Sequence, residues 1–190
     1  MRILLSARAS VSGSAASVLA ALVLVIFAPL AGGPPARAQS HPDAPRNDYP
    51  DPYRTINDWA KLPAGRAWGS VGGVGVDSHN NIWVAERCGA NTCAGSDLDP
   101  ILEFSPSGKL LISFGAGMFV FPHGLAVDTR GRVWVSDGQG KDGKGQQVFE
   151  FSPDGKVPMT LGKAGVAGSG PDEFHNPSAV AIAPNGDIFV

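Results

Sequence analysis

The chain has 190 residues, with 15 Lys and Arg against 17 Asp and Glu, and its formal net charge is −2 at pH 7. This mildly acidic balance comes without a basic patch, which argues against nucleic acid as a partner.

Residues 1–38 have the pattern of a secretory signal peptide. Arg2 and Arg8 make the start positive, the apolar run at 18–30 is short for a membrane span, and an A-x-A cleavage pattern occupies 36–38. Cleavage would leave 12 basic and 17 acidic residues, a net charge of −5. We therefore expect an exported protein, periplasmic or secreted, with no membrane association after cleavage; an uncleaved membrane anchor is the alternative.

Residues 39–66 are rich in Pro and polar residues and are expected to form an extended N-terminal arm. Pro removes backbone donors and disfavours helix, so at most one short helical turn is predicted, at 55–61. Tyr53, Trp59 and Leu62 are the side chains that could attach this arm to the surface of the following domain.

Three copies of one sequence unit follow, aligned at Gly73, Gly124 and Ala179, so their spacing is 51 and then 55 positions. Each copy runs through a polar turn into an apolar triplet, at 82–84, 133–135 and 188–190. A unit that recurs at such a period indicates a repeat architecture. Because the third copy stops inside its triplet, we expect the chain to be an N-terminal fragment of a longer repeat protein.

Each unit within residues 67–190 is expected to form a four-stranded antiparallel sheet. Strands are predicted at 71–77, 82–85, 101–104 and 109–114, and again at 123–128, 132–136, 147–151 and 156–161. Gly, Pro, Asn and Asp mark the turns between them. The apolar triplets do not alternate with polar residues, which is typical of strands buried on both faces.

Four-stranded sheets stacked radially are the blades of a β-propeller. The sequence thus predicts an all-β fold, a truncated β-propeller of about two and a half blades. Its sheets at 71–117 and 123–165 should pack face to face, with a hairpin at 179–190. A right-handed solenoid is the competing architecture, but its rungs are usually shorter than these repeats.

The chain has two cysteines, Cys88 and Cys93, in one short segment. In the oxidising compartment of an exported protein, a disulfide within this loop is the default expectation. A metal site is the weaker alternative, because no second Cys or His pair stands nearby at zinc-finger spacing.

Three blocks, LAVD at 125–128, GRVWVSD at 131–137 and VFEFSPDG at 148–155, resemble the NHL repeats of six-bladed propellers. Two longer stretches, from VGGVGVD at 71 to Arg87 and from FPHGL at 121 to Asp137, resemble peptidyl-α-hydroxyglycine α-amidating lyases. The resemblance implies a carbon–nitrogen lyase that splits a C-terminal α-hydroxyglycine into a peptide amide and glyoxylate. It also implies a peptide or small-molecule substrate and a monomeric intact protein.

Lyases of this kind use a zinc ion held by three histidines, a structural calcium ion, and an arginine and a tyrosine at the site. By position, His123 matches the first zinc histidine, and Arg87 matches the site arginine. Val71 and Leu125 match two calcium ligands that act through backbone carbonyls. The other two histidines, the tyrosine and the carboxylate of the calcium site would fall after Val190, so we expect the 190-residue chain alone to be inactive.

The repeat itself singles out His123, because framework positions keep their residue type between copies whereas His123 becomes Ser178. A histidine at the start of an innermost strand lies at the mouth of a propeller channel, where ligands from several blades can meet one zinc ion. The alternative is a histidine hydrogen-bonded within a turn. Arg87, replaced by Gly138, would hold a substrate carboxylate through its planar fork, or would be a surface cation over the cysteine loop.

The remaining polar residues have structural interpretations. Asp77 and Asp128 recur at matched positions and are predicted to cap turns. The run at 137–145 lacks the spacing of an EF-hand and is predicted to be a flexible hairpin loop. Asp97 and Asp99 are interpreted as loop acids, and two exposed histidines are expected in polar connections, His79 and His175.

Three function classes remain open. The first is a metal-dependent lyase of the amidating type, and the second is a non-catalytic NHL propeller that binds a peptide or glycan. The third is a lactonase-like, calcium-dependent propeller hydrolase. Two more Pro-His strand starts and a tyrosine in the remaining blades would favour the lyase, whereas acidic residues converging in the channel would favour the hydrolase.

Overall fold

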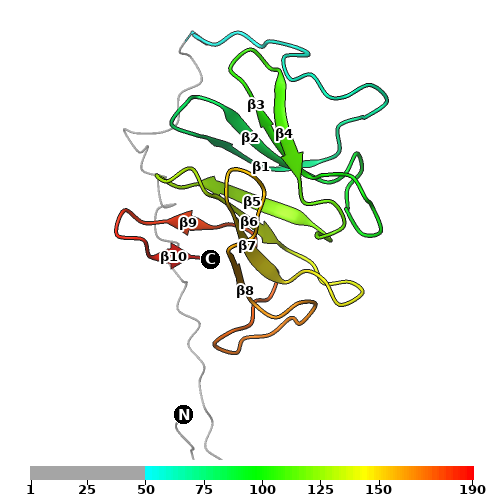
Figure 1. Cartoon of the computed structure of the whole chain (residues 1–190), viewed down its shortest axis with the longest axis vertical. Helices are drawn as coiled ribbons and strands as arrows, with labels where there is room; N and C mark the ends of the chain where they lie inside the picture. Colours follow the sequence, from blue (N-terminus) through cyan, green and yellow to red (C-terminus); the bar gives the residue numbers. More distant parts are fainter. Residues whose placement is uncertain (1–49) are drawn as a thin grey trace, which may run out of the picture. The chain divides into compact units, whose positions relative to one another are not determined.

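Ten β-strands and no helix are present in residues 50–190, the part of the chain that the computed structural model describes (Figure 1). The predicted signal peptide at 1–38 and the first part of the predicted arm, residues 39–49, lie outside this range. Residues 52–190 form one compact unit. Within the described residues, no helix is long and apolar enough to cross a membrane.

The strands form two four-stranded antiparallel sheets and a hairpin. The first sheet has the order β1 (Val71–Val76), β2 (Ile82–Glu86), β3 (Ile101–Phe104), β4 (Leu110–Phe114). The second repeats it with β5 (Pro122–Val127), β6 (Val133–Asp137), β7 (Gln147–Phe151) and β8 (Met159–Leu161). The hairpin pairs β9 (Ala181–Ile182) with β10 (Ile188–Phe189). The predicted all-β fold, with two four-stranded antiparallel sheets followed by a hairpin, is confirmed.

Two details of the predicted secondary structure are corrected, one strand boundary and one helical turn. β8 begins at Met159, not at residue 156, because Pro158 has no backbone N–H with which to extend the ladder. Residues 55–61 hold only a turn at 57–58 in place of a helical turn. The reason is that the backbone N–H of Lys61 donates to the carbonyl of Gly108, 2.9 Å away, in the first sheet.

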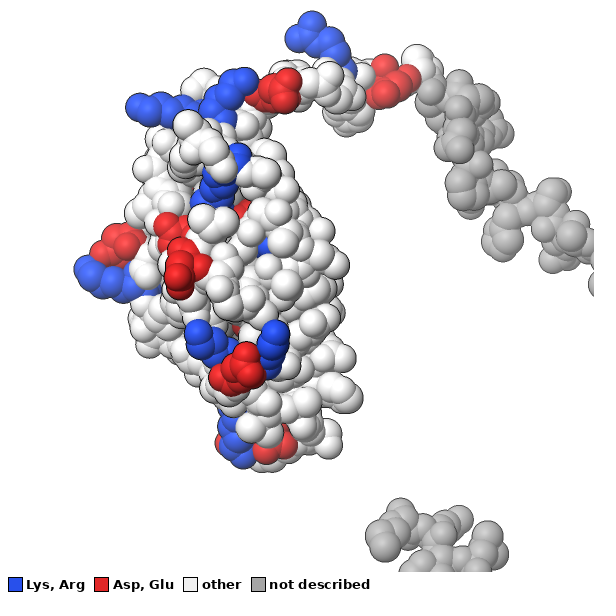
Figure 2. Space-filling view, turned by 90° about the vertical axis from the view of Figure 1, so that its right-hand side faces the viewer, with Lys and Arg blue, Asp and Glu red and all other residues white. Residues whose placement is uncertain are grey.

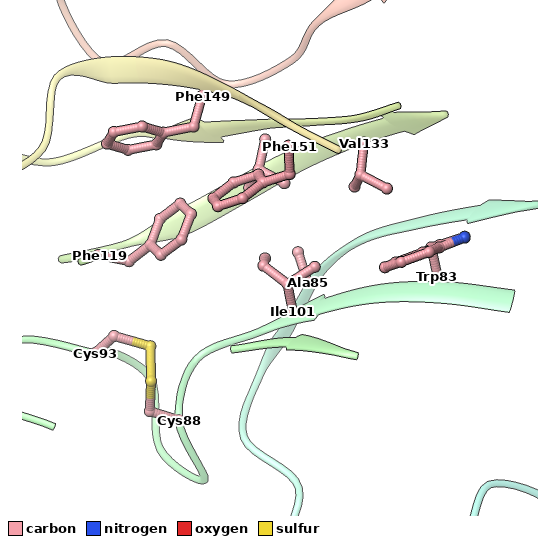
Figure 3. Packing of buried hydrophobic residues seen from close by; sticks show 10 residues of the cluster. Trp83, Ala85, Cys88, Cys93, Ile101, Phe119, Val133, Phe149 and Phe151 are labelled. Carbon is pink, nitrogen blue, oxygen red and sulfur yellow. A yellow bond between two sulfur atoms is a disulfide. The ribbon is translucent and has the colours of Figure 1, made fainter. Parts of the chain in front are cut away.

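The two large sheets pack face to face, as predicted. Their shared core contains Trp83, Ala85 and Ile101 from the first sheet and Val133, Val135, Phe149 and Phe151 from the second. Phe119, from the connection between the sheets, joins this core, and its ring contacts Phe149 edge-on at 5.2 Å (Figure 3). The hairpin continues the series, because Val180, Ile182 and Ile188 pack against Trp134 and Val148 of the second sheet.

Glycine allows the innermost strands to touch through their backbones. A Cβ atom on Gly72 would lie 2.6 Å from the carbonyl oxygen of His123, and one on Gly73 would lie 2.6 Å from the nitrogen of Leu125. One repeat later, a Cβ on Gly124 would lie 2.6 Å from the Cα of Ala179. The recurring glycine is therefore required by the close approach of β1 to β5 and of β5 to the next copy.

The arm is held to the first sheet by two of its three predicted anchors. Trp59 and Leu62 pack against Val84, Leu102 and Phe104, and the Trp59 Nε1 donates to the carbonyl of Pro106 at 3.0 Å. Tyr53 is 85% exposed and lies outside this cluster. The anchoring of residues 59–62 thus depends on apolar burial and on two hydrogen bonds to backbone carbonyls, from the Trp59 indole and from the N–H of Lys61.

Asp77 and Asp128 cap the first turn of their repeats, which confirms their predicted role. In each case Oδ1 accepts from the backbone N–H groups two and four residues later, at 2.8–3.0 Å. The other oxygen lies 3.3–3.4 Å from the indole nitrogen of Trp83 or Trp134. The acid therefore links the turn to the buried tryptophan of the following strand.

The two repeats differ in the side chain that donates to these acids: it is charged in the second repeat and neutral in the first. Arg132 bridges Asp128 and Glu150, with both N–O distances 2.6 Å. At the matched position in the first sheet, the neutral Asn81 donates to Asp77 at 3.2 Å and to Glu103 at 2.8 Å. Burial raises the pKa of Glu103, and the nearby charge of Asp77 adds to this effect.

We predict that Arg132→Ala lowers the free energy of unfolding by roughly 2–4 kcal/mol, because two buried carboxylates lose their shared cation. Arg132→Asn should cost less, since Asn81 shows that an amide can donate to both acids. Urea unfolding measures both, with the exposed Arg130→Ala as control. Equal effects of Arg132→Ala and Arg130→Ala would contradict the prediction.

Candidate functional site

The candidate site lies where β1 and β5 begin, and both strands are irregular there. The register between β1 and β2 shifts between Val71 and Gly73, and that between β5 and β6 shifts between Pro122 and Leu125. Irregularities of this kind are over-represented next to active sites, where they redirect side chains. The two shifts occupy matched places in the repeat and flank His123.

His123 is half-buried and is oriented by the next repeat. Its Nδ1 lies 2.8 Å from the carbonyl oxygen of Ser178, 55 positions along the chain. Because a carbonyl only accepts, Nδ1 must carry the proton, and the lone pair of a neutral ring is then on Nε2. Metal-binding histidines are commonly held in this way, by a hydrogen bond from the second nitrogen to a backbone carbonyl. The alternative of a hydrogen bond within one turn does not hold.

Arg87 follows β2 and extends over the residues that lead into β5. Its Cζ lies 3.5 Å from the centre of the Phe121 ring, and its Nε donates to the carbonyl of Pro122 at 3.2 Å. Nη1 donates to Oδ1 of Asn91 at 2.7 Å. Burial lowers the pKa of the Arg87 guanidinium, which nevertheless stays charged at neutral pH.

The partners of Arg87 distinguish it from the other half-buried arginines of the described residues. Arg66 pairs with Glu86 at 2.6 Å, and Arg132 pairs with two carboxylates. Arg87 has a carbonyl, an amide and a ring face instead, all of them neutral. A partly desolvated cation is normally compensated by an anion. The arrangement therefore suits an anionic ligand.

The structure places three of the four predicted site residues, Val71, His123 and Leu125, on the facing strands β1 and β5, and Arg87 directly after β2. The Phe121 ring lies under Arg87 and 6.0 Å from the His123 ring, so Arg87 and His123 share one aromatic neighbour. Val71 and Leu125 lie on β1 and β5, which are in backbone contact at Gly73. Within residues 50–190, no cluster of three or more His, Cys, Asp or Glu residues could hold a metal ion.

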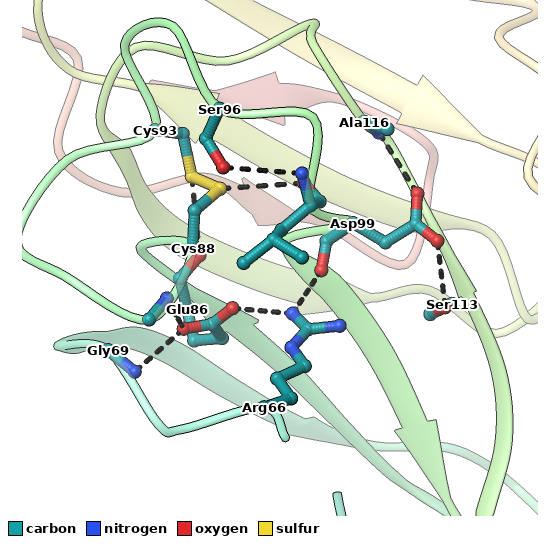
Figure 4. A network of polar contacts seen from close by, with 11 residues as sticks. Arg66, Gly69, Glu86, Cys88, Cys93, Ser96, Asp99, Ser113 and Ala116 are labelled. Atoms are coloured by element: carbon teal, nitrogen blue, oxygen red, sulfur yellow. Dashed lines mark hydrogen bonds and ion pairs between the residues drawn. A yellow bond between two sulfur atoms is a disulfide. The ribbon is translucent and has the colours of Figure 1, made fainter. Parts of the chain in front are cut away.

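Two buried carboxylates support this site, and both were missed as site residues. Asp137 is fully buried, and its oxygens accept from the backbone N–H groups of Val120 at 2.9 Å and Phe121 at 2.5 Å. Glu86, at the matched position, accepts from the N–H groups of Gly69 at 2.8 Å and Gly89 at 2.9 Å (Figure 4). The sequence did contain a signal for them, because an acid stands two positions after the apolar triplet in both complete copies.

Asp137 corrects the prediction for 137–145, because this residue ends β6 and does not belong to the loop. The remainder is a hairpin loop, as predicted, closed by two 3.0 Å backbone hydrogen bonds between Lys141 and Lys144. Asp99 also has a defined role, since it accepts from the Ser113 hydroxyl at 2.8 Å and from the N–H of Ala116 at 3.1 Å (Figure 4).

Cys88 and Cys93 form the predicted disulfide, with an S–S distance of 2.01 Å, and both residues are buried.

On the face of the molecule shown in Figure 2, basic and acidic side chains are interspersed, and no extended basic patch is present.

A family model described as NHL repeat matches residues 119–142, the segment from Phe119 through His123 to the loop after Asp137. The chain carries an NHL repeat. It is 43% identical over 94 residues to peptidyl-alpha-hydroxyglycine alpha-amidating lyase 1 of Drosophila melanogaster, an alignment that covers 47% of this chain and 16% of that protein.

Two further relatives cover more of the chain. A probable peptidyl-alpha-hydroxyglycine alpha-amidating lyase of Caenorhabditis elegans is 32% identical over 64% of this chain and 38% of its own length. Rat peptidylglycine alpha-amidating monooxygenase is 32% identical over 64% of this chain and 14% of its own length. The chain thus resembles amidating lyases but spans less than two fifths of each of these relatives.

Among solved structures, a Bacteroides caccae protein of unknown function aligns with a TM-score of 0.41 and 13% identity, over 67% of this chain and 39% of that one. This likeness is too low to support an inference.

Burial raises the pKa of Asp137 to about 6, although two backbone N–H donors favour its charged form. Between about pH 4 and pH 6 the folded protein therefore keeps a proton that the unfolded chain releases. This group should lower the free energy of unfolding by roughly 2–3 kcal/mol as the pH rises across that interval.

Urea unfolding across this pH range should show the decrease in wild type relative to Asp137→Asn, whose amide does not titrate. Parallel pH profiles for the two proteins would contradict the assignment.

Proposed function

We propose that the intact protein acts as a lyase of the peptidyl-α-hydroxyglycine α-amidating type, which releases glyoxylate and a peptide amide. The observation that carries the proposal is the pairing of Arg87, a partly desolvated cation with neutral partners, with an oriented His123 beside the same ring. The likeness in sequence to amidating lyases supports it.

The proposed reaction breaks the bond between the amide nitrogen and the α-carbon of a C-terminal α-hydroxyglycine. The hydroxyl loses its proton and becomes the aldehyde oxygen of glyoxylate, and the amide nitrogen gains a proton. The substrate thus carries a carboxylate, a hydroxyl and an amide nitrogen on one α-carbon. A site for it needs a cation for the carboxylate and a group that acts at the hydroxyl.

Arg87 is proposed to bind the carboxylate. Its Nε and one Nη1 donor are used by Pro122 and Asn91, so the Nη2 edge of the guanidinium is the part available to a ligand. The Phe121 face fixes the plane of the guanidinium, and a fixed planar fork matches a carboxylate with two parallel hydrogen bonds. The ring also excludes water from one side, which strengthens the ion pair.

His123 is proposed to bind zinc through Nε2. Its fit rests on the hydrogen bond from Nδ1 to the Ser178 carbonyl, which leaves Nε2 as the free lone pair. A zinc ion at this position would lower the pKa of a coordinated hydroxyl group. Val71 and Leu125 are proposed to offer backbone carbonyls to calcium. The described residues supply one imidazole here, and the other zinc ligands are assigned to none of them.

Export is also proposed. The signal-peptide pattern at 1–38 and the buried Cys88–Cys93 disulfide both support an oxidising compartment outside the cytoplasm. An exported protein would encounter peptide substrates that are present outside the cytoplasm. The same Arg87 arrangement would also suit a propeller that binds peptide C-termini without cleaving them, and the assays below separate the two.

In the protein purified from its host, His123→Ala should remove zinc and glyoxylate release together, because Nε2 is lost. Ser178→Ala is the matched control, since its backbone carbonyl, not its hydroxyl, accepts from His123. It should retain both. Metal analysis and a glyoxylate assay on the same samples provide the measurement. Retention of zinc and turnover in His123→Ala would refute the assignment.

Arg87→Met should lower kcat/KM for a peptidyl-α-hydroxyglycine roughly 100-fold, the effect expected for a lost charge-assisted contact to a carboxylate. Arg130→Met, in an exposed turn, serves as the control and should change little. If wild type binds the peptide carboxylate through Arg87 yet releases no glyoxylate, the protein is the non-catalytic binder.

A further inference from the structure

The loop closed by Cys88 and Cys93 begins directly after Arg87 and contains Asn91. It is six residues long from one cysteine to the other, and the disulfide is buried under it. Asn91 itself is exposed at the surface, with its Oδ1 against Nη1 of Arg87 at 2.7 Å. The guanidinium end of Arg87 is thus hydrogen-bonded to a residue in the middle of a cross-linked loop.

This loop is attached to the residues that precede both innermost strands. The Ala90 carbonyl accepts from the N–H of Ser70, just before β1, at 2.7 Å. The carbonyl of Val120, two residues before β5, accepts from the N–H of Cys93 and from the Thr92 hydroxyl, each at 2.9 Å. The loop therefore has a fixed position relative to Phe121 and Pro122, on which Arg87 rests.

A second tie runs through the buried acid of the first sheet. The N–H of Gly89 donates to Oε2 of Glu86 at 2.9 Å, and the Cys93 sulfur lies 3.8 Å from the Glu86 carbonyl (Figure 4). Glu86 is in turn paired with Arg66 at 2.6 Å. The start of the loop is therefore anchored, through the N–H of Gly89, to a carboxylate that does not reach solvent.

Arginine has a long side chain with considerable rotamer freedom, and an unrestrained guanidinium binds a carboxylate with a loss of entropy. Three contacts restrain Arg87: the ring face of Phe121, the carbonyl of Pro122, and the amide oxygen of Asn91. The first two fix the plane and the Nε edge. Only Asn91 holds the Nη1 end, and so decides where the free Nη2 edge points.

We propose that Asn91, held in place by the Cys88–Cys93 disulfide, is a positioning residue that orients Arg87 toward a ligand's C-terminal carboxylate. This inference rests on the proposed role of Arg87. It adds that carboxylate recognition depends on an intact disulfide, so that loss of the cross-link weakens ligand binding without removing any group that touches the ligand.

The test uses a ligand that the proposed chemistry cannot consume, a short peptide ending in glycine, with the same peptide ending in a C-terminal amide as its neutral counterpart. Calorimetry gives the ratio of the two dissociation constants, the carboxylate preference. This ratio does not change when a variant merely alters stability or the affinity for the rest of the peptide.

Asn91→Ala should reduce the carboxylate preference roughly 5–10-fold. With a peptidyl-α-hydroxyglycine as substrate, it should raise KM more than it lowers kcat. Asn185→Ala, an exposed turn asparagine bonded to Asp187, is the matched control and should leave the ratio unchanged. The Cys88→Ala, Cys93→Ala double variant should shift the ratio in the same direction as Asn91→Ala. Thermal melting of each variant shows whether it is folded.

The outcomes separate this inference from the proposed function. If Arg87→Met abolishes the carboxylate preference but Asn91→Ala leaves it intact, the positioning role is wrong and the role of Arg87 stands. If wild type shows no carboxylate preference, both are overturned. A normal ratio in a folded double cysteine variant would overturn the dependence on the disulfide even where Asn91→Ala has its expected effect.

Discussion

Backbone contact between successive innermost strands is the constraint on which the rest of the structure depends. It is possible because Gly72, Gly73 and Gly124 have no Cβ, and any larger residue would meet a neighbouring backbone at about 2.6 Å. The contact sets the distance between the sheets, and so allows the aromatic core to fill the space between them. It also brings the end of β2 to the start of β5, which is why Arg87 reaches a ring that lies more than thirty residues away in sequence.

Buried carboxylates then fix the segments that the glycines bring together. Glu86 and Asp137 occupy the same position in the two sheets. Each accepts hydrogen bonds from the backbone just before an innermost strand: Glu86 from Gly69, and Asp137 from Val120 and Phe121. A buried acid is costly unless it is hydrogen-bonded, so these contacts specify the path of the chain strongly. The path of Val120 and Phe121 in turn determines where the ring beneath Arg87 lies. Stability and site geometry are coupled through these two residues.

A few replacements distinguish the candidate site from the framework that the repeats share. Gly138 stands where the first copy has Arg87, and a Cβ there would lie only 3.2 Å from the carbonyl oxygen of Pro177, so a larger residue would press on the start of the third copy. Ser178 stands where the second copy has His123 and contributes only its carbonyl. Asn81 replaces Arg132 between two acids, without changing the turn. The framework tolerates each change because its own hydrogen bonds come from the strand ladders and from the acids that both copies keep, Asp77 and Asp128, Glu86 and Asp137.

The sequence by itself determined the all-β fold, the two four-stranded sheets, the turn acids and the disulfide. These features follow from local patterns, namely strand periodicity, turn residues and cysteine spacing, and the repeat allowed each to be checked against its copy. Sequence comparison also singled out Arg87 and His123. Only the tertiary structure decided that these two share Phe121, that Ser178 orients the histidine, and that Asn91 and Asp137 support the site. Those contacts join residues 4 to 55 positions apart, and their geometry depends on how the sheets pack, which no local pattern records.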